Sequence, residues 1–207
     1  MVESGADYLV WSSMISPNKL SGGKFKNVDL FESKYDVQQY IRSLPIKASF
    51  FIPGSFFQNY QTQTKPRPMG DGTYGLFNIM SSEDKVALID IANDTGKWVV
   101  PMLTEPEKYN GKGIACATKA YTQQEIADAI SKATGKTVKH IQIPVEKFEG
   151  FLPEGSRTMI SEMWQHIRDD RYYGAEEDKE LEFGHQQVTG RLTTFEEYLE
   201  REPLKLE

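Results

Sequence analysis

The sequence has little cysteine and little histidine, and neither residue is arranged as a metal site requires. The 207 residues include one cysteine and three histidines. A single cysteine excludes a disulfide within the chain, which is typical of proteins from a reducing compartment. Cys116 lies in the apolar stretch GIACAT, so we favour a small buried hydrophobe over the alternative of a reactive thiol. His140, His166 and His185 lack the spacing of zinc ligands, and we expect no metal.

Long apolar runs and an excess of positive charge are also absent. No stretch approaches the length that spans a membrane, and the N-terminal MVESGADYLVW does not have the pattern of a signal peptide. Lysine and arginine number 24 against 30 aspartates and glutamates, for a formal net charge of −6. A direct nucleic-acid interface needs clustered positive charge. We therefore expect neither nucleic acid nor membrane as a partner, and a cytoplasmic location with the nucleus as a second compartment.

One glycine-rich string, GDGTYG at residues 70–75, matches the G-x-G-x-x-G fingerprint of dinucleotide-binding turns. That fingerprint requires a strand before its first glycine and a helix after its last. Here Pro66 and Pro68 precede it, and proline lacks the N–H that a central strand donates. Asp71-Gly72 is instead typical of a two-residue hairpin turn, since both residues tolerate positive φ. We predict a β-hairpin at this string and no phosphate site.

The first part of the chain is organised as strand, helix, strand. Residues 7–14, DYLVWSSM, have the β-rich composition of a buried strand, and residues 47–54 form a second such run that ends at Pro53-Gly54. Between them, residues 29–45 have a helical pattern that Pro45 ends. One face of this helix would carry Val37, Tyr40, Ile41 and Leu44. This order predicts a βαβ unit with parallel strands and a right-handed crossover.

The remaining segments alternate between helical and strand patterns. Residues 121–136 give the clearest helix, with a capping box of Thr122 and Glu125 and a stop at Gly135. Residues 84–96 also have a helical pattern, whereas KWVVPML and GKGIACAT have the composition of strands. A strand is expected in TVKHIQIPVEKF, and helices in residues 158–173 and TTFEEYLERE. We interpret the acidic run GAEEDKELEFG as a solvated face.

In this order and spacing, the segments resemble the NmrA-like family of atypical short-chain dehydrogenases. The resemblance runs from about residue 6 to residue 200 and is carried by VWSSM, FESKYDVQQYIR, FFIPGSFFQNY, VALIDIANDTG, KYNGKGIACAT, YTQQEIADAISKATGK and TFEEYLERE. It implies an α/β fold, with the C-terminal part of a Rossmann-type parallel sheet and a smaller α+β C-terminal lobe. Residues 1–60 would then belong to the nucleotide-binding sheet. Residues 61–207 would form mainly the lobe, with 84–120 packing back on the sheet.

The resemblance also implies NADP or NAD as cofactor and assigns site residues. The lysine of the superfamily's Tyr-x-x-x-Lys pair, which orients the nicotinamide ribose, matches Lys34, the candidate catalytic residue. Leu30 stands where the proton-donating tyrosine would be. The implied cofactor-binding residues are Ser12, Ser13, Lys34, Pro53, Gly54, Ser55, Phe56, Phe57 and Asn59. The alternatives remain open that Lys34 is simply exposed, that the serines cap a turn, and that the phenylalanines are core.

The family's glycine-rich turn lies before the strand that resembles DYLVWSSM, so the resemblance places that turn outside this chain. We therefore expect a non-catalytic or degenerate NAD(P)-linked regulatory or redox-sensing module that acts through protein partners. One alternative is an NADPH-dependent oxidoreductase or isomerase that uses Lys34, with the nucleotide site completed by residues outside this chain. Another is a structural interaction protein without nucleotide. The first strand would be an open edge, which predicts a homodimer or a partner protein that covers it.

Overall fold

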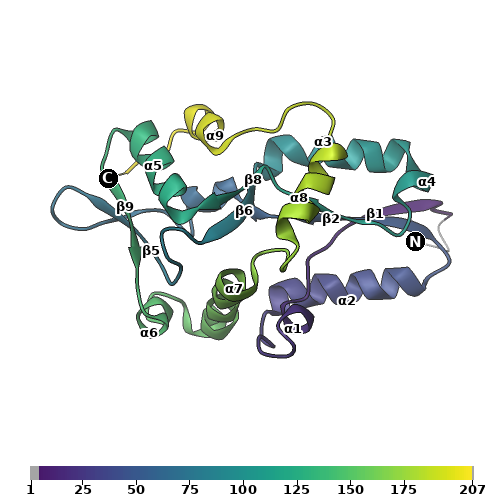
Figure 1. The fold of residues 1–207 in the computed structure, drawn as a ribbon, viewed down its shortest axis with the longest axis horizontal. Helices are drawn as coiled ribbons and strands as arrows, with labels where there is room; N and C mark the ends of the chain where they lie inside the picture. The colour runs from purple at the N-terminus through teal and green to yellow at the C-terminus, as the bar shows by residue number, and fades with distance from the viewer. Residues whose placement is uncertain (1–4, 207) are drawn as a thin grey trace.

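The centre of the fold is a parallel sheet with strand order β1-β2-β7. The computed structural model describes residues 5–206, and in it the sheet consists of β1 (Tyr8–Ser12), β2 (Lys47–Pro53) and β7 (Gly113–Cys116). Helix α2 (Asp29–Ser43) connects β1 to β2, which confirms the predicted βαβ unit and the α/β class. Figure 1 shows α2 on one side of these strands and α3 (Ile91–Thr104) on the other.

Strand β2 is buried on both faces because helices cover the sheet on both sides. Phe50 packs in a cluster with Ile41 of α2, whereas the next residue, Phe51, packs with Trp98 and Met102 of α3. Successive side chains of a strand point to opposite faces, so the continuous apolar run KASFFIP suits a strand between two layers of helices.

The face predicted for α2 is only partly correct. Ile41 is buried, but Val37 is 39% exposed and Tyr40 is 65% exposed. The helix buries Gln38 instead, and the side-chain amide of Gln38 pairs with the hydroxyl of Ser13 at the end of the sheet. A polar residue thus occupies part of the inner face because it has a hydrogen-bonding partner there.

The prediction of a helix over residues 84–96, followed by a strand in KWVVPML, is wrong. Residues Lys85–Ile89 form strand β6, and α3 begins after Asp90, whose carboxylate caps the helix by accepting from the backbone N–H of Asn93. Pro101 lies inside α3 and leaves the carbonyl of Lys97 without its helical donor. The backbone N–H and hydroxyl of Thr189 both donate to that carbonyl, at 2.9 and 3.0 Å. A contact from a distant segment therefore permits proline in the helix.

Two further small sheets extend the fold beyond β2. Strand β3 (Ser55–Phe56) pairs with β6, which pairs with β8 (Lys119–Thr122). Strand β5 (Tyr74–Asn78) lies between β4 (Arg67–Pro68) and β9 (Val138–Gln142). The short helix η2 (Phe57–Gln61) joins the first of these regions to the second.

The glycine-rich string forms the predicted hairpin between β4 and β5, but its turn differs from the prediction. Positive φ occurs at Gly70 and Gly72 and not at Asp71. The backbone N–H of Met69 donates to the carbonyl of Thr73, so the loop is longer than two residues. Asp71 accepts hydrogen bonds from Thr73, which closes the turn locally.

The predicted helix after Thr122 is confirmed as α5 (Gln123–Thr134), with both hydrogen bonds of the capping box and Gly135 at φ 66°. The other helices include α7 (Arg157–Asp170) and α9 (Phe195–Arg201), both predicted. The remaining helical segments are α1 (Pro17–Leu20), α4 (Pro106–Tyr109), α6 (Val145–Glu149), η3 (Glu154–Ser156) and α8 (Glu177–Gln186).

The acidic run is not simply a solvated face, because much of it forms α8, which packs against β7. Glu177, Leu181 and Gly184 are buried there. A Cβ atom at Gly184 would lie 2.1 Å from the carbonyl oxygen of Ala115, so only glycine permits this close approach. Cys116, in the same strand, is fully buried, and burial raises the pKa of its thiol, as expected for a small core residue.

Candidate functional site

A cavity of about 790 Å³ opens beyond the carboxyl ends of β1 and β2. Helix α2 and the segment after β2 form one side, and β5, α6 and α7 form the other. In Figure 1 the N-terminal helices and α7 lie on the same side of the strands. Ligands of open α/β sheets bind beyond the carboxyl ends of the strands, so the cavity is in the expected place for a binding site.

Lys34 lines this cavity from the middle of α2 and is half-buried. Its Nζ donates to the carbonyl oxygen and to the hydroxyl of Ser12, both at the long distance of 3.3 Å. It forms no ion pair with any residue from 5 to 206. Leu30, one helical turn earlier, also lines the cavity and is 54% exposed. The ammonium group therefore has the capacity to bind an added acceptor.

The two serines at the end of β1 point in different directions. Ser12 is exposed and touches Lys34, as described above. Ser13 is fully buried, and its hydroxyl lies against the Gln38 side chain and the backbone of α2. Because adjacent residues of an extended segment face opposite sides, only one of the pair can face the site. Neither serine is among the residues that line the cavity: Ser12 is connected to it only through its contact with Lys34, and Ser13 is buried against α2.

The turn after β2 supplies most of the other residues implied by the resemblance. The cavity is lined by Pro53, Gly54, Ser55, Phe56 and Asn59. The Asn59 amide donates to the Ser55 hydroxyl at 3.3 Å. A Cβ atom at Gly54 would lie 2.6 Å from the carbonyl oxygen of Ala87, so this glycine is required by its packing on β6.

The two adjacent phenylalanines of this turn have different roles. Phe56 is 36% exposed and lines the cavity. Phe57 is fully buried, with its ring centroid 5.0 Å from that of Phe195 and 5.5 Å from that of Tyr198. Phe57 is thus a core residue that attaches the turn to α9, and it does not reach the cavity.

Two tyrosines that sequence reasoning did not select also line the cavity. The hydroxyl of Tyr172 donates to the carbonyl oxygen of Pro53 at 3.2 Å. Tyr60 is buried at the start of the segment that leads to β4. Burial raises the pKa of both phenols far above neutral pH. Neither side chain is therefore poised to replace the missing tyrosine as a proton donor.

The outer wall of the cavity was not predicted at all. It contains the cations Lys65 and Arg67 and the apolar side chains Phe148, Phe151, Met159, Ile160, Met163 and Trp164. The spacing of TMISEMWQHI indicated an amphipathic helix, but such a pattern does not tell which element its apolar face will meet. The sequence therefore predicted that α7 is a helix, but it gave no indication that this helix forms a wall of the cavity.

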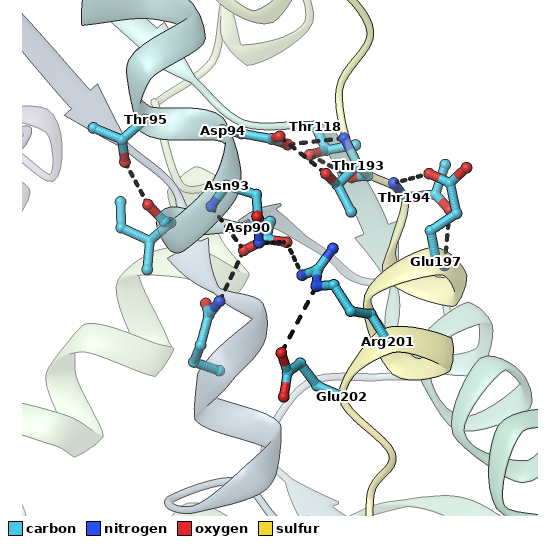
Figure 2. A network of polar contacts seen from close by, with 12 residues as sticks. Asp90, Asn93, Asp94, Thr95, Thr118, Thr193, Thr194, Glu197, Arg201 and Glu202 are labelled. Carbon is cyan, nitrogen blue, oxygen red and sulfur yellow. Dashed lines mark hydrogen bonds and ion pairs between the residues drawn. The ribbon is translucent and has the colours of Figure 1, made fainter.

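A network of hydrogen bonds and ion pairs around two buried carboxylates lies on the other side of the turn (Figure 2). Asp90 is fully buried and accepts hydrogen bonds from Gln58 of η2, at 2.9 Å, and from Asn93, at 3.0 Å. It also forms an ion pair with Arg201 of α9. Burial alone would raise the pKa of Asp90, but the hydrogen bonds from Arg201, Gln58 and Asn93 outweigh it and hold that pKa below its usual value.

Asp94, one turn later in α3, holds the segment that precedes α9. Its carboxylate is fully buried and pairs with Lys97 at 2.6 Å. It also accepts from the backbone N–H of Thr193 at 2.9 Å and from the hydroxyl of Thr193 at 3.0 Å. Asp90 and Asp94 together hold α9 against α3. Through its contact with Gln58, Asp90 also holds the segment after β2, whose other side lines the cavity.

No group of three or more histidine, cysteine, aspartate or glutamate side chains in residues 5–206 is arranged to hold a metal ion. None of the helices described here is long and apolar enough to cross a membrane.

Comparisons with known proteins point to one family. Residues 1–199 match the NmrA-like family. An NmrA-like family domain-containing protein of Dictyostelium discoideum is 28% identical over 214 residues, which cover 100% of this chain and 68% of that protein. The nitrogen metabolite repression protein nmrA of Emericella nidulans is 23% identical over 158 residues, which cover 74% of this chain and 44% of that protein. The chain thus spans only part of these relatives.

Solved structures show the same fold. NmrA, a negative transcriptional regulator, in complex with NADP has a TM-score of 0.70 at 20% identity, over 96% of this chain and 65% of that one. An NADPH-dependent quinone oxidoreductase of Escherichia coli complexed with NADPH also has a TM-score of 0.70, at 15% identity, over 96% of this chain and 66% of that one. The Rossmann-like α/β fold expected from the sequence is therefore confirmed.

Proposed function

Because the chain belongs to the NmrA-like family, we propose that it holds the nicotinamide half of NADP or NAD and works as a regulatory or redox-sensing module that acts through protein partners. The observation that carries this proposal is Lys34. Its ammonium group lines a large cavity at the carboxyl edge of the sheet and has no carboxylate partner among the described residues. A half-buried cation in that state favours a ligand with hydroxyl or anionic oxygens.

The residues around Lys34 fit a nicotinamide riboside in chemical type. Lys34 and the Ser12 hydroxyl provide donors for ribose oxygens, and the Asn59 amide both donates and accepts, as a carboxamide requires. Phe56 provides an apolar surface for the ring. When bound, the nicotinamide supplies or accepts a hydride, whereas the chain's own residues bind and orient it.

A regulatory role is favoured over proton-transfer catalysis because, among residues 5–206, the cavity wall has no acid at the position of the family's tyrosine. Leu30 has no proton to give at the position of the family's tyrosine. The buried phenols of Tyr60 and Tyr172 have raised pKa values, and Tyr172 already donates to Pro53. A homodimer or a protein partner on the β1 edge is part of this proposal, since β1 is the edge strand of its sheet in residues 5–206.

Thermal unfolding with millimolar NADP⁺, NADPH, NAD⁺ and NADH tests the proposal, with nicotinamide mononucleotide as a probe for the nicotinamide half alone. A ligand at a hundred times its Kd adds about 2.7 kcal/mol to the free energy of unfolding. We expect a rise in Tm that Lys34→Met abolishes. A difference between the oxidised and reduced forms would support redox sensing.

Lys26→Met is the matched control, because Lys26 is exposed and lies outside the cavity wall. It should retain the full shift in Tm. If none of the nucleotides shifts the Tm of the unaltered chain, the proposal fails. The remaining explanations are then a structural interaction protein without nucleotide and an enzyme whose nucleotide site needs residues outside this chain.

The second candidate function is an NAD(P)H-dependent oxidoreductase or isomerase that uses Lys34, with the nucleotide site completed by residues outside this chain. The size of the cavity beside Lys34 favours it, since 790 Å³ is large enough for an organic substrate next to a nicotinamide. The loss of absorbance at about 340 nm from NADPH, with menadione as acceptor, would measure such activity. Turnover that Lys34→Met removes in a folded protein would favour the enzyme over the regulator.

A further inference from the structure

The charged residues that line the cavity are all of one sign. Lys34, Lys65 and Arg67 line it, whereas no aspartate or glutamate does so among the described residues. This contrasts with the chain as a whole, which has more acidic than basic residues. A cavity that collects cations in an acidic protein attracts anions, because field lines are focused into a low-dielectric concave site.

The two outer cations are without ion-pair partners. Lys65 and Arg67 form no ion pair with any residue in the part of the chain that the structure describes. The Arg67 guanidinium lies over the ring of Phe151, 4.7 Å from its centroid. The Phe77 ring meets the same Phe151 ring at 5.8 Å, edge to face. Arg67 is therefore positioned by aromatic contacts, and its N–H donors are not taken up by a carboxylate.

The body of the cavity is apolar and largely aromatic. Its wall includes Phe31, Phe56, Tyr60, Phe77, Phe148, Phe151, Trp164 and Tyr172, together with three methionines and other aliphatic side chains. Aromatic rings prefer edge-to-face or offset contacts with another ring, and methionine adapts to irregular apolar shapes. This lining fits a flat or bulky apolar group better than a sugar or a peptide.

From these two features we infer that the cavity binds an amphipathic organic anion, with an aromatic or otherwise apolar body among the rings and a carboxylate or sulfonate at Lys65 and Arg67. The inference deepens the proposed function, on which it rests for the role of the ligand beside the nicotinamide. The fixed fork of Arg67 can donate two parallel hydrogen bonds to a carboxylate, and Lys65 supports this contact as a point charge.

Fluorescence titration with 1-pyrenebutyrate and the uncharged 1-pyrenebutanol tests the inference on the unaltered chain at pH 7. Both probes carry the same ring system, so their difference measures the contribution of the negative charge. We expect the carboxylate to bind about tenfold more tightly at low ionic strength, and less so in high salt. The double variant Lys65→Gln/Arg67→Gln should remove this preference and leave the affinity for the alcohol unchanged.

Lys132→Gln/Lys136→Gln is the matched control, since it makes the same charge change at exposed residues outside the cavity wall. This control variant should still bind 1-pyrenebutyrate about tenfold more tightly than 1-pyrenebutanol. Met159→Trp should weaken both probes together by filling the cavity, and would thereby place the pyrene inside it. Equal affinity for the two probes, or a preference that only the control variant removes, would overturn the inference.

The same titration separates this inference from the proposed function. Charge-selective binding without any nucleotide effect on Tm would support the anion site and contradict the nicotinamide proposal. A nucleotide effect on Tm that depends on Lys34, together with equal affinity for the two pyrene probes, would support the nicotinamide proposal and contradict the anion site.

Discussion

The turn that follows β2 has polar groups on both of its sides, but the two sides are organised differently. Toward α3 and α9, the carboxylates of Asp90 and Asp94 are fully buried, and each has several donors. Arg201 and Gln58 are among the donors to Asp90, and Thr193 donates to Asp94. We call this side the closed side. Toward α2 and α7, Lys34, Lys65 and Arg67 line an open cavity without carboxylate partners; this is the open side.

The contrast separates structural polar groups from binding groups. Buried charges are stable only when they are paired and hydrogen-bonded, so the two carboxylates of the closed side have the partners that a folded core requires. Cations that line a cavity without partners add little to stability, and their hydrogen-bonding capacity is available to a ligand. The difference predicts opposite outcomes for substitutions on the two sides of one turn.

The largest effect is expected on the closed side, for Asp90→Ala. Loss of the carboxylate leaves the Gln58 amide without its acceptor, leaves the Arg201 guanidinium with only its longer contact to Glu202, and removes the cap of α3. We expect a loss of about 3 kcal/mol in the free energy of unfolding, measured by urea denaturation. Asp128→Ala, at an exposed position of α5, is the control and should change it by less than about 0.5 kcal/mol. A loss below about 1 kcal/mol for Asp90→Ala would remove the distinction between the sides.

A smaller effect is expected from acid, through the same carboxylate. The pKa of Asp90 is lowered in the folded protein, so folding is favoured by the ionised form. This stabilisation is complete above the unfolded-state pKa of about 3.9 and is lost as the pH falls through the lower folded-state pKa. Asp90→Asn cannot titrate, so its deficit in stability relative to the unaltered chain should shrink as the pH falls below about 4. A deficit that is constant from pH 7 to pH 3 would contradict the lowered pKa.

The smallest effect on stability is expected on the open side. Lys34→Met and Arg67→Gln each remove a positive charge but leave no carboxylate unpaired, because neither cation has such a partner in residues 5–206. We expect each change to alter the free energy of unfolding by less than about 0.5 kcal/mol in urea denaturation without ligand. A loss comparable with that of Asp90→Ala would mean that the open side is a structural network after all.

Local sequence signals were sufficient where neighbouring residues decide the structure. The capping box of Thr122 and Glu125 and the left-handed Gly135 define α5 from within the helix itself. The β-hairpin at residues 70–75 was likewise predictable, since Pro66 and Pro68 exclude a central strand and the glycines permit the turn. The position of Lys34 at the carboxyl edge of the sheet followed from the βαβ order and the resemblance together.

Other features depended on contacts that no local pattern contains. The apolar run VALI is compatible with either a helix or a strand, and its pairing with β3 and β8 makes it part of β6. Pro101 is tolerated in α3 because Thr189, far away in the chain, donates to the carbonyl that proline leaves free. Nothing in the acidic run around Gly184 indicates that glycine is required there. The requirement comes from the close contact between α8 and the backbone of β7.

The sequence by itself thus determined the α/β class, the βαβ unit, the capped helices and the chemical types at the edge of the sheet. Only the tertiary structure decided that Ser12 is exposed and Ser13 is buried. It also decided that Phe56 lines the cavity whereas Phe57 is part of the core. Lys65 and Arg67 line the same cavity as Lys34 only because the chain folds back on itself. The physical reason is the distance along the chain over which each interaction acts. Hydrogen bonding and side-chain periodicity act over a few residues, whereas a cavity is formed by packing between segments that the chain brings together from more than a hundred residues apart.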